Sequence, residues 1–207
     1  MLAVQLPKGL SADDYLAWEA AQPERHEYVD GEIFAMVGVR LNHNRITLNA
    51  AMLLRDGLRG RPCAVFASDV KLQVRAANAW FYPDLVVTCD ERDLSDSDAA
   101  AVQHPWLVVE VLSEATEAYD RGKKFEFYRT IATLTHYLLV DATRPSAELF
   151  VKNEQGLWVL HPVPPGGTLR IAEPHTLSWP LAALYEGVRW GASGSVDPAG
   201  AAGVSAG

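Results

Sequence analysis

Two carboxylates stand at positions where they could share a metal ion. Asp84 opens the apolar run 82–88, and Glu110 lies inside the apolar run 106–113. Both runs are predicted to be buried strands, because they are rich in apolar residues and show little alternation. An ionised carboxylate in such a strand costs on the order of several kcal/mol unless a cation or hydrogen-bond donors meet it. Glu110 therefore needs a partner.

The chemistry that these acids suggest is binding of a hard divalent cation. If the two strands pair, a spacing of about 5 Å places both carboxylates within reach of one ion. Mg²⁺ and Mn²⁺ prefer oxygen ligands, often one or two carboxylates together with water and phosphate oxygens. The backbone carbonyl of Val111 is the natural additional ligand. We therefore expect a Mg²⁺ (or Mn²⁺) site formed by Asp84, Glu110 and Val111.

A basic group is expected from the helix that follows. Residues 120–124 read Asp-Arg-Gly-Lys-Lys, and Tyr128 comes one helical turn after Lys124. Lys124 borders the apolar face, so its stem can pack while its ammonium reaches inward. Next to a metal and a phosphodiester, it could position water or offset charge on the phosphate. Lys123 is the rival candidate, since a lysine pair on a helix is usually a solvated face.

The elements that must position these groups follow from hydrophobic periodicity and from capping and turn signals. We predict helices over 11–21, capped by Ser11, over 42–59, capped by Asn42, and over 116–131, capped by Thr116, with a helical turn at 181–185. Asp30-Gly31 predicts a hairpin over 26–36. Further strands are expected at 62–67, 70–75, 82–88, 106–113, 135–141, 147–152, 157–161, 168–171 and 176–178. The fold class is α/β in the broad sense, a mixed α+β sheet flanked by helices. One domain is expected over 1–190, with a flexible Gly/Ala-rich tail over 191–207.

Composition restricts the function further. The chain has 207 residues, a formal net charge of −8 and 49% hydrophobic residues, which argues against a generic DNA-coating or anionic-membrane surface but not against a local basic groove. No apolar run approaches the ~20 residues of a membrane-spanning helix.

The histidines form no visible cluster, so zinc is not expected. Cys63 and Cys89 lack metal-type spacing; Cys63 is predicted to be a small core residue, a disulfide is not expected, and the cytoplasm is the expected compartment.

Several motifs together resemble a known family. They are Tyr82-Pro83-Asp84, residues 109–113, residues 120–124 with Tyr128, and residues 137–141. In this order they are similar to the Uma-type family of predicted endonucleases, in the PD-(D/E)XK restriction-endonuclease-like superfamily, over about residues 11–185. The resemblance implies a restriction-endonuclease-like core sheet, Mg²⁺-dependent hydrolysis of nucleic acid, DNA before RNA, and a homodimer. It also implies that Glu27 and His43 join the site.

The chain departs from the superfamily pattern at one position. The superfamily places a lysine two residues after the strand acid, where this chain has Leu112; the resemblance implies that Lys124 replaces it. This departure and the acidic balance leave open a nuclease-fold module that binds nucleic acid or protein without catalysis. A glycosidase pair is a third reading, because such carboxylates lie ~5–10 Å apart beside aromatic residues, here Trp80, Phe81 and Tyr82.

Each candidate also has an ordinary structural reading. Glu110 could pair with a core lysine or arginine, and Asp84 could accept a backbone N–H at a strand start. Glu27 could be an exposed hairpin residue and His43 a local helix-start residue, while Tyr128 is favoured as a packing residue.

Overall fold

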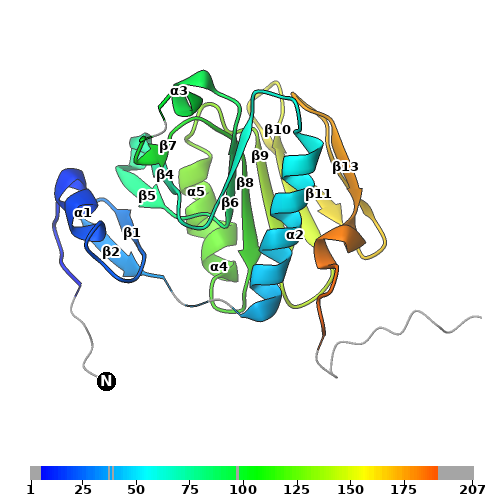
Figure 1. The fold of residues 1–207 in the computed structure, drawn as a ribbon, viewed down its shortest axis with the longest axis horizontal. Helices are drawn as coiled ribbons and strands as arrows, with labels where there is room; N and C mark the ends of the chain where they lie inside the picture. Colours follow the sequence, from blue (N-terminus) through cyan, green and yellow to red (C-terminus); the bar gives the residue numbers. More distant parts are fainter. Residues whose placement is uncertain (1–5, 37, 39, 97, 191–207) are drawn as a thin grey trace, which may run out of the picture.

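A six-stranded mixed sheet forms the centre of the molecule (Figure 1). The computed structural model describes residues 6–36, 38, 40–96 and 98–190. The central strand β8 (Pro105–Leu112) is buried along its whole length. It runs parallel to β9 (His136–Asp141) and antiparallel to β6 (Leu85–Thr88). The sheet is completed by β10 (Ala147–Lys152), β11 (Trp158–Val163) and β3 (Ala64–Ala67). The strand predicted over 106–113 and its pairing with the Asp84 strand are confirmed.

Helices cover the two faces of this sheet (Figure 1). Helix α2 (Leu41–Gly57) packs Ile46 and Leu54 on the face that carries Val109 and Val111. The predicted cap at Asn42 is wrong, because Arg40 holds the N-cap position. The side-chain Nδ2 of Asn42 donates instead to the Arg189 carbonyl.

The opposite face is covered by a helical segment with an irregular centre. It consists of α4 (Glu117–Tyr119), a π-helical turn η2 (Asp120–Lys124) and α5 (Phe125–Tyr128). The regular helix expected over 116–131 is therefore wrong in detail, and the Thr116 side chain makes no capping bond. Such π turns are rare and are frequently found at functional sites. Phe125 and Tyr128 pack with Val108 and Leu112 in the core on this side.

A second, five-stranded sheet lies beside the first, in the order β2-β1-β5-β4-β7. Its strands are β1 (His26–Val29), β2 (Glu32–Ala35), β4 (Lys71–Val74), β5 (Ala79–Phe81) and β7 (Ala101–Val102). Asp30 and Gly31 have positive φ angles of 44° and 92°, which form the predicted hairpin turn. Helix α1 (Ala12–Glu19) is capped by Ser11, as predicted. The Ser11 hydroxyl accepts from the Asp14 backbone amide.

The chain passes from one sheet to the other just before the predicted site. Strand β5 was not predicted, and the strand expected over 82–88 begins only at Leu85. The Tyr82-Pro83-Asp84 segment therefore links β5 in the second sheet to β6 in the central sheet. Asp84 stands at the junction, where residues from both sheets can reach it.

The remaining elements complete a mixed α+β fold, as predicted. They are η1 (Arg75–Ala77), α3 (Glu91–Leu94), the hairpin of β12 (Thr168–Ile171) with β13 (Leu177–Pro180), and η3 (Leu181–Tyr185). Within the described ranges, no helix is both long enough and apolar enough to cross a membrane. The tail predicted over 191–207 lies outside the described residues.

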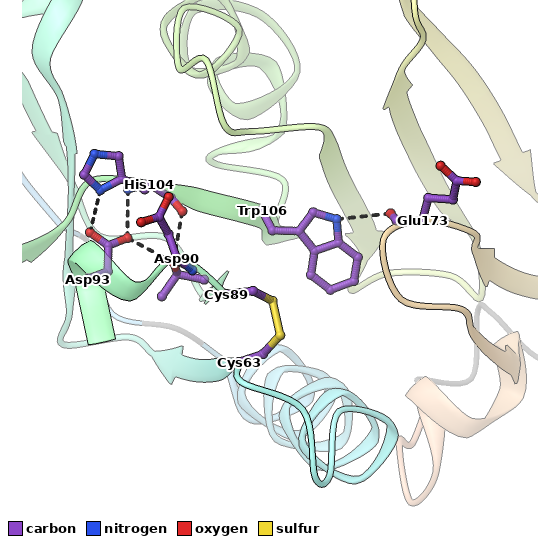
Figure 2. The surroundings of a disulfide bond; sticks show 8 residues. Cys63, Cys89, Asp90, Asp93, His104, Trp106 and Glu173 are labelled. Atoms are coloured by element: carbon purple, nitrogen blue, oxygen red, sulfur yellow. Dashed lines mark hydrogen bonds and ion pairs between the residues drawn. A yellow bond between two sulfur atoms is a disulfide. The ribbon is translucent and has the colours of Figure 1, made fainter. Parts of the chain in front are cut away.

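The cysteines contradict the sequence prediction, because Cys63 and Cys89 form a disulfide bond (Figure 2). Ala64 pairs with Thr88 in the antiparallel β3–β6 ladder. The two cysteines therefore lie opposite each other just past the ends of these strands. Linear spacing could not reveal this, since it does not show which strands pair.

Candidate active site

Asp84 and Glu110 lie next to each other at the edge where β6 begins. Leu85 pairs with Val109, so the preceding residue, Asp84, falls opposite Glu110. The Asp84 amide nitrogen lies 3.4 Å from Glu110 Oε2. The Val111 amide donates to Asp84 Oδ2 at 2.7 Å, which fixes the carboxylate against β8. The Asp84 side chain is 18% exposed and that of Glu110 only 4%, so the pair reaches solvent through Asp84.

The partner that Glu110 requires is Lys124. Its Nζ atom lies 3.1 Å from Glu110 Oε1, and the Tyr128 hydroxyl donates to the same oxygen at 2.9 Å. Tyr128 therefore contributes a hydrogen bond as well as packing. Lys123 points elsewhere: it pairs with Glu126 at 3.1 Å, and both side chains are more than half exposed. The geometry favours Lys124 over Lys123 as the lysine near the acids.

Glu27 reaches this lysine from the second sheet. Its Oε1 atom lies 3.0 Å from Lys124 Nζ and accepts from the Tyr82 amide at 3.3 Å. Glu27 is buried, so its reading as an exposed hairpin residue is wrong. The link Tyr82–Asp84 thus contacts both Glu27 and Glu110.

His43 approaches the cluster from the first turn of α2. Its Nε2 atom lies 3.4 Å from Asp84 Oδ2. Its buried Nδ1 atom has no hydrogen-bond partner among the described residues. All the predicted site residues therefore converge: Asp84, Glu110, Val111, Lys124, Glu27 and His43.

Asp120 is a member that the sequence analysis missed. Its Oδ1 atom lies 3.6 Å from Lys124 Nζ across the π turn, and the residue is buried. The Tyr137 hydroxyl donates to the Asp120 carbonyl at 3.0 Å and holds this turn against β9. The available signal was its place four residues before Lys124, a spacing that lets the two side chains meet on a helix.

Negative charge exceeds positive charge in this buried cluster. Burial raises the pKa of Glu110 well above its ordinary value; Lys124 opposes that shift, while the Asp120, Asp84 and Glu27 carboxylates add to it. Burial lowers the pKa of Lys124, but the charges of Glu110, Glu27 and Asp120 outweigh burial. The pKa lies well above its ordinary value, so the lysine stays charged. Burial also raises the pKa of Asp120. One ammonium faces three carboxylates, so the cluster is suited to an additional cation or proton.

The histidine adds a second basic group beside Asp84. Burial lowers the pKa of His43, but its hydrogen bond to Asp84, the Asp84 charge, the Val111 backbone and Asp120 together raise it above its ordinary value. Asp84 thus lies between a histidine on one side and the Glu110–Lys124 pair on the other.

The donor set at this edge fits a hard divalent ion. Asp84 and Glu110 supply carboxylate oxygens, which Mg²⁺ and Mn²⁺ prefer. No hydrogen bond among the described residues uses Asp84 Oδ1, which leaves that oxygen open to a ligand. The surplus negative charge would be offset by the same ion.

The glycosidase reading is not supported by the surroundings of the pair. Trp80, Phe81 and Tyr82 are all buried, so they cannot line an open sugar cleft. Phe81 packs at right angles to Tyr128, and Trp80 packs on Tyr28.

The fold of the chain is nuclease-like. A crystal structure described as a putative nuclease belonging to DUF820, from Anabaena variabilis, superposes with a TM-score of 0.66. It covers 86% of this chain and 98% of that one, at 14% identity, and so supports the fold alone. The model of the family Uma2, described as putative restriction endonuclease, matches residues 12–183, and the chain belongs to this family.

Two relatives of the chain occur in Synechocystis sp.. The uncharacterized protein slr1290 of Synechocystis sp. is 43% identical over 151 residues, which is 73% of this chain and 78% of that protein. The uncharacterized protein sll1609 of the same organism is 37% identical over 160 residues, covering 77% of this chain and 90% of that protein.

Proposed function

We propose that this protein is a Mg²⁺-dependent (or Mn²⁺-dependent) endonuclease that hydrolyses phosphodiester bonds in nucleic acid. The observation that carries the proposal is the meeting of Asp84, Glu110 and Lys124 at one partly open edge of the central sheet. The family and fold, both of which are described as nuclease-like, agree with it.

In this proposal, Asp84 and Glu110 hold the metal with help from the Val111 carbonyl. When bound, the ion would supply Lewis-acid stabilisation of the phosphate and activation of water. The Val111 amide keeps Asp84 oriented. Tyr128 and Lys124 hold Glu110 from behind, so its second oxygen, near the Asp84 amide, stays directed to the shared edge.

Lys124 offsets the charge that develops on the phosphate, or positions water. It is enclosed by Glu110, Glu27 and Asp120, so it acts from behind the acids rather than as an exposed phosphate clamp. The Glu27 carboxylate helps to keep this lysine protonated, because its negative charge raises the pKa of Lys124. His43, which is buried 3.4 Å from Asp84, can hold a proton beside that carboxylate.

The proposed substrate is nucleic acid, with DNA favoured over RNA. The proposed assembly is a homodimer, and the proposed compartment is the cytoplasm. The net charge of −8 means that any contact with phosphates must be local, since the chain as a whole repels them. Light scattering on the purified chain tests the dimer, and a comparison of DNA and RNA substrates tests the preference.

The experiment is a cleavage assay on single- and double-stranded DNA and RNA with Mg²⁺, Mn²⁺ or EDTA. Glu110→Gln should lose at least about 100-fold in rate, because an amide is a poorer ligand for a hard ion than a carboxylate. Lys123→Met is the matched control, since it removes a surface charge from the same segment. Metal-dependent cleavage that survives both Glu110→Gln and Glu110→Ala would refute the assignment.

A non-catalytic nuclease-fold module is the second candidate, favoured by the saturation of Lys124 with carboxylate contacts. Calorimetry with Mg²⁺ separates the two functions. The endonuclease requires Mg²⁺ binding that depends on Asp84 and Glu110, whereas the module would bind nucleic acid or protein without it.

A further inference from the structure

A second group of potential metal ligands lies away from the acidic cluster. It consists of Cys63, Cys89 and His175, which are all half-buried. Their two sulfur atoms and one imidazole nitrogen all lie within 4.8 Å of one another. Among the described residues, no other group of three histidine, cysteine or acidic side chains meets this distance.

Three separate parts of the fold bring these ligands together. Cys63 precedes β3 and Cys89 follows β6, and the antiparallel register of these strands sets the two cysteines face to face. His175 comes from the loop between β12 and β13. Its place is therefore independent of the strand pairing that joins the cysteines.

Trp106 on β8 holds this loop in place. The His175 ring packs edge-on against the indole, with ring centroids 5.5 Å apart and planes at 85°. The indole Nε1 donates to the Glu173 carbonyl at 3.2 Å, as Figure 2 shows beside the disulfide. The imidazole is thus positioned by a central strand rather than by a free loop.

The chemistry of this ligand set differs from that of the acidic cluster. Two thiolates and an imidazole select thiophilic ions such as Zn²⁺, whereas carboxylates select Mg²⁺. A cavity adjoins each cysteine: Cys63 lines one of about 590 Å³ and Cys89 one of about 240 Å³. Three protein ligands leave a fourth position for water or another small ligand.

We propose that Cys63, Cys89 and His175 bind one thiophilic cation, such as Zn²⁺, when the disulfide is reduced. Two molecules of a small thiol supply the two electrons and two protons that break the S–S bond, and they leave as one oxidised disulfide. The cation then displaces the two thiol protons and binds both sulfurs. The disulfide is the metal-free form of the same site. This site is separate from the proposed nuclease centre, so either proposal can fail without the other.

The test uses the full chain, reduced with a small thiol that is then removed under nitrogen. Reduced wild type should bind one equivalent of Zn²⁺ more than the oxidised protein in calorimetry, because the acidic cluster can take up a divalent ion in either form. Co²⁺ should give a thiolate charge-transfer band with the reduced protein alone. Cys89→Ser should lose the band, and His175→Ala should weaken Zn²⁺ binding at least about tenfold, by comparison with the loss of supporting groups in known sites.

Two controls keep the outcome decisive. Asp84→Asn must leave the band and the affinity unchanged, because it alters only the acidic site. Zn²⁺ should also protect both thiols of the wild type from alkylation, a readout that needs no variant. Loss of fold on reduction, no gain of Zn²⁺ binding on reduction, unchanged affinity in His175→Ala, or loss of the band in Asp84→Asn would each overturn the proposal.

Discussion

Lys124 and Glu27 meet at the junction of the two sheets, with Nζ 3.0 Å from Oε1. Glu27 belongs to the N-terminal hairpin and Lys124 to the π turn that covers the central sheet. Both side chains are almost fully buried. Their contact means that the site is assembled from two sheets, and its stability and its chemistry can be tested through the same residues.

Removal of the buried ammonium should be far more costly than removal of its surface neighbour. Lys124→Met leaves Glu110, Glu27 and Asp120 without their shared cation, and breaking a buried ion pair in this way costs about 3–5 kcal/mol. Lys123→Met should change the free energy of unfolding by less than about 1 kcal/mol, because its pair with Glu126 is exposed. Urea unfolding of the two variants measures the difference; equal effects would contradict the buried role.

The Tyr128 hydroxyl should contribute measurably to the stability of the Glu110 carboxylate. Tyr128→Phe keeps the ring packing but removes the donor 2.9 Å from Oε1. A buried acceptor that loses a partner costs about 1–3 kcal/mol. Tyr119→Phe, in the same helical segment, is the control. Thermal and urea unfolding should separate the two tyrosines, and an unchanged Tyr128→Phe protein would count against the contact.

Metal binding should stabilise the folded chain. If Asp84 and Glu110 hold Mg²⁺, a concentration about 100-fold above the dissociation constant should add about 2.7 kcal/mol to the free energy of unfolding. Asp84→Asn should abolish most of this gain. Differential scanning calorimetry with and without Mg²⁺ measures it, and the same gain in Asp84→Asn would place the ion elsewhere.

Acid should destabilise the protein through His136. This residue is buried on β9, and burial lowers its pKa to about 4, with a smaller contribution from His161. The unfolded chain, with an ordinary value near 6.5, binds the proton first. The free energy of unfolding is therefore unaffected by His136 above about pH 6.5. As the pH falls toward 4, protonation of this residue in the unfolded chain lowers that free energy by up to about 3 kcal/mol. His136→Gln should flatten this slope in urea titrations at pH 7, 6, 5 and 4; an unchanged slope would assign the acid sensitivity to other groups.

The central sheet and the acid pair were predictable because their signals are local. Residues 106–113 and 82–88 are both apolar runs with little alternation, which is typical of strands buried on both faces. The need of a buried carboxylate for a cation likewise pointed to the following helix, and Lys124 meets Glu110 there.

Features that depend on contacts between distant segments were not predictable from the residues. Strand β5 is only three residues long, and its pairing with β1 and β4 gives no local pattern. The π turn arises where Asp120 and Lys124 both turn inward, which no helical periodicity encodes. The Cys63–Cys89 bond required knowledge of the β3–β6 register.

The placement of Glu27 on a hairpin outside the central sheet makes that hairpin part of the charge balance around Lys124. Strand β1 joins the rest of its sheet through only two residue pairs with β5, Tyr28 with Trp80 and Val29 with Ala79. Displacement of this hairpin would remove one of the three carboxylates that face Lys124 and leave Glu110 and Asp120. The charge around Lys124 therefore depends in part on a residue that the central sheet does not contain.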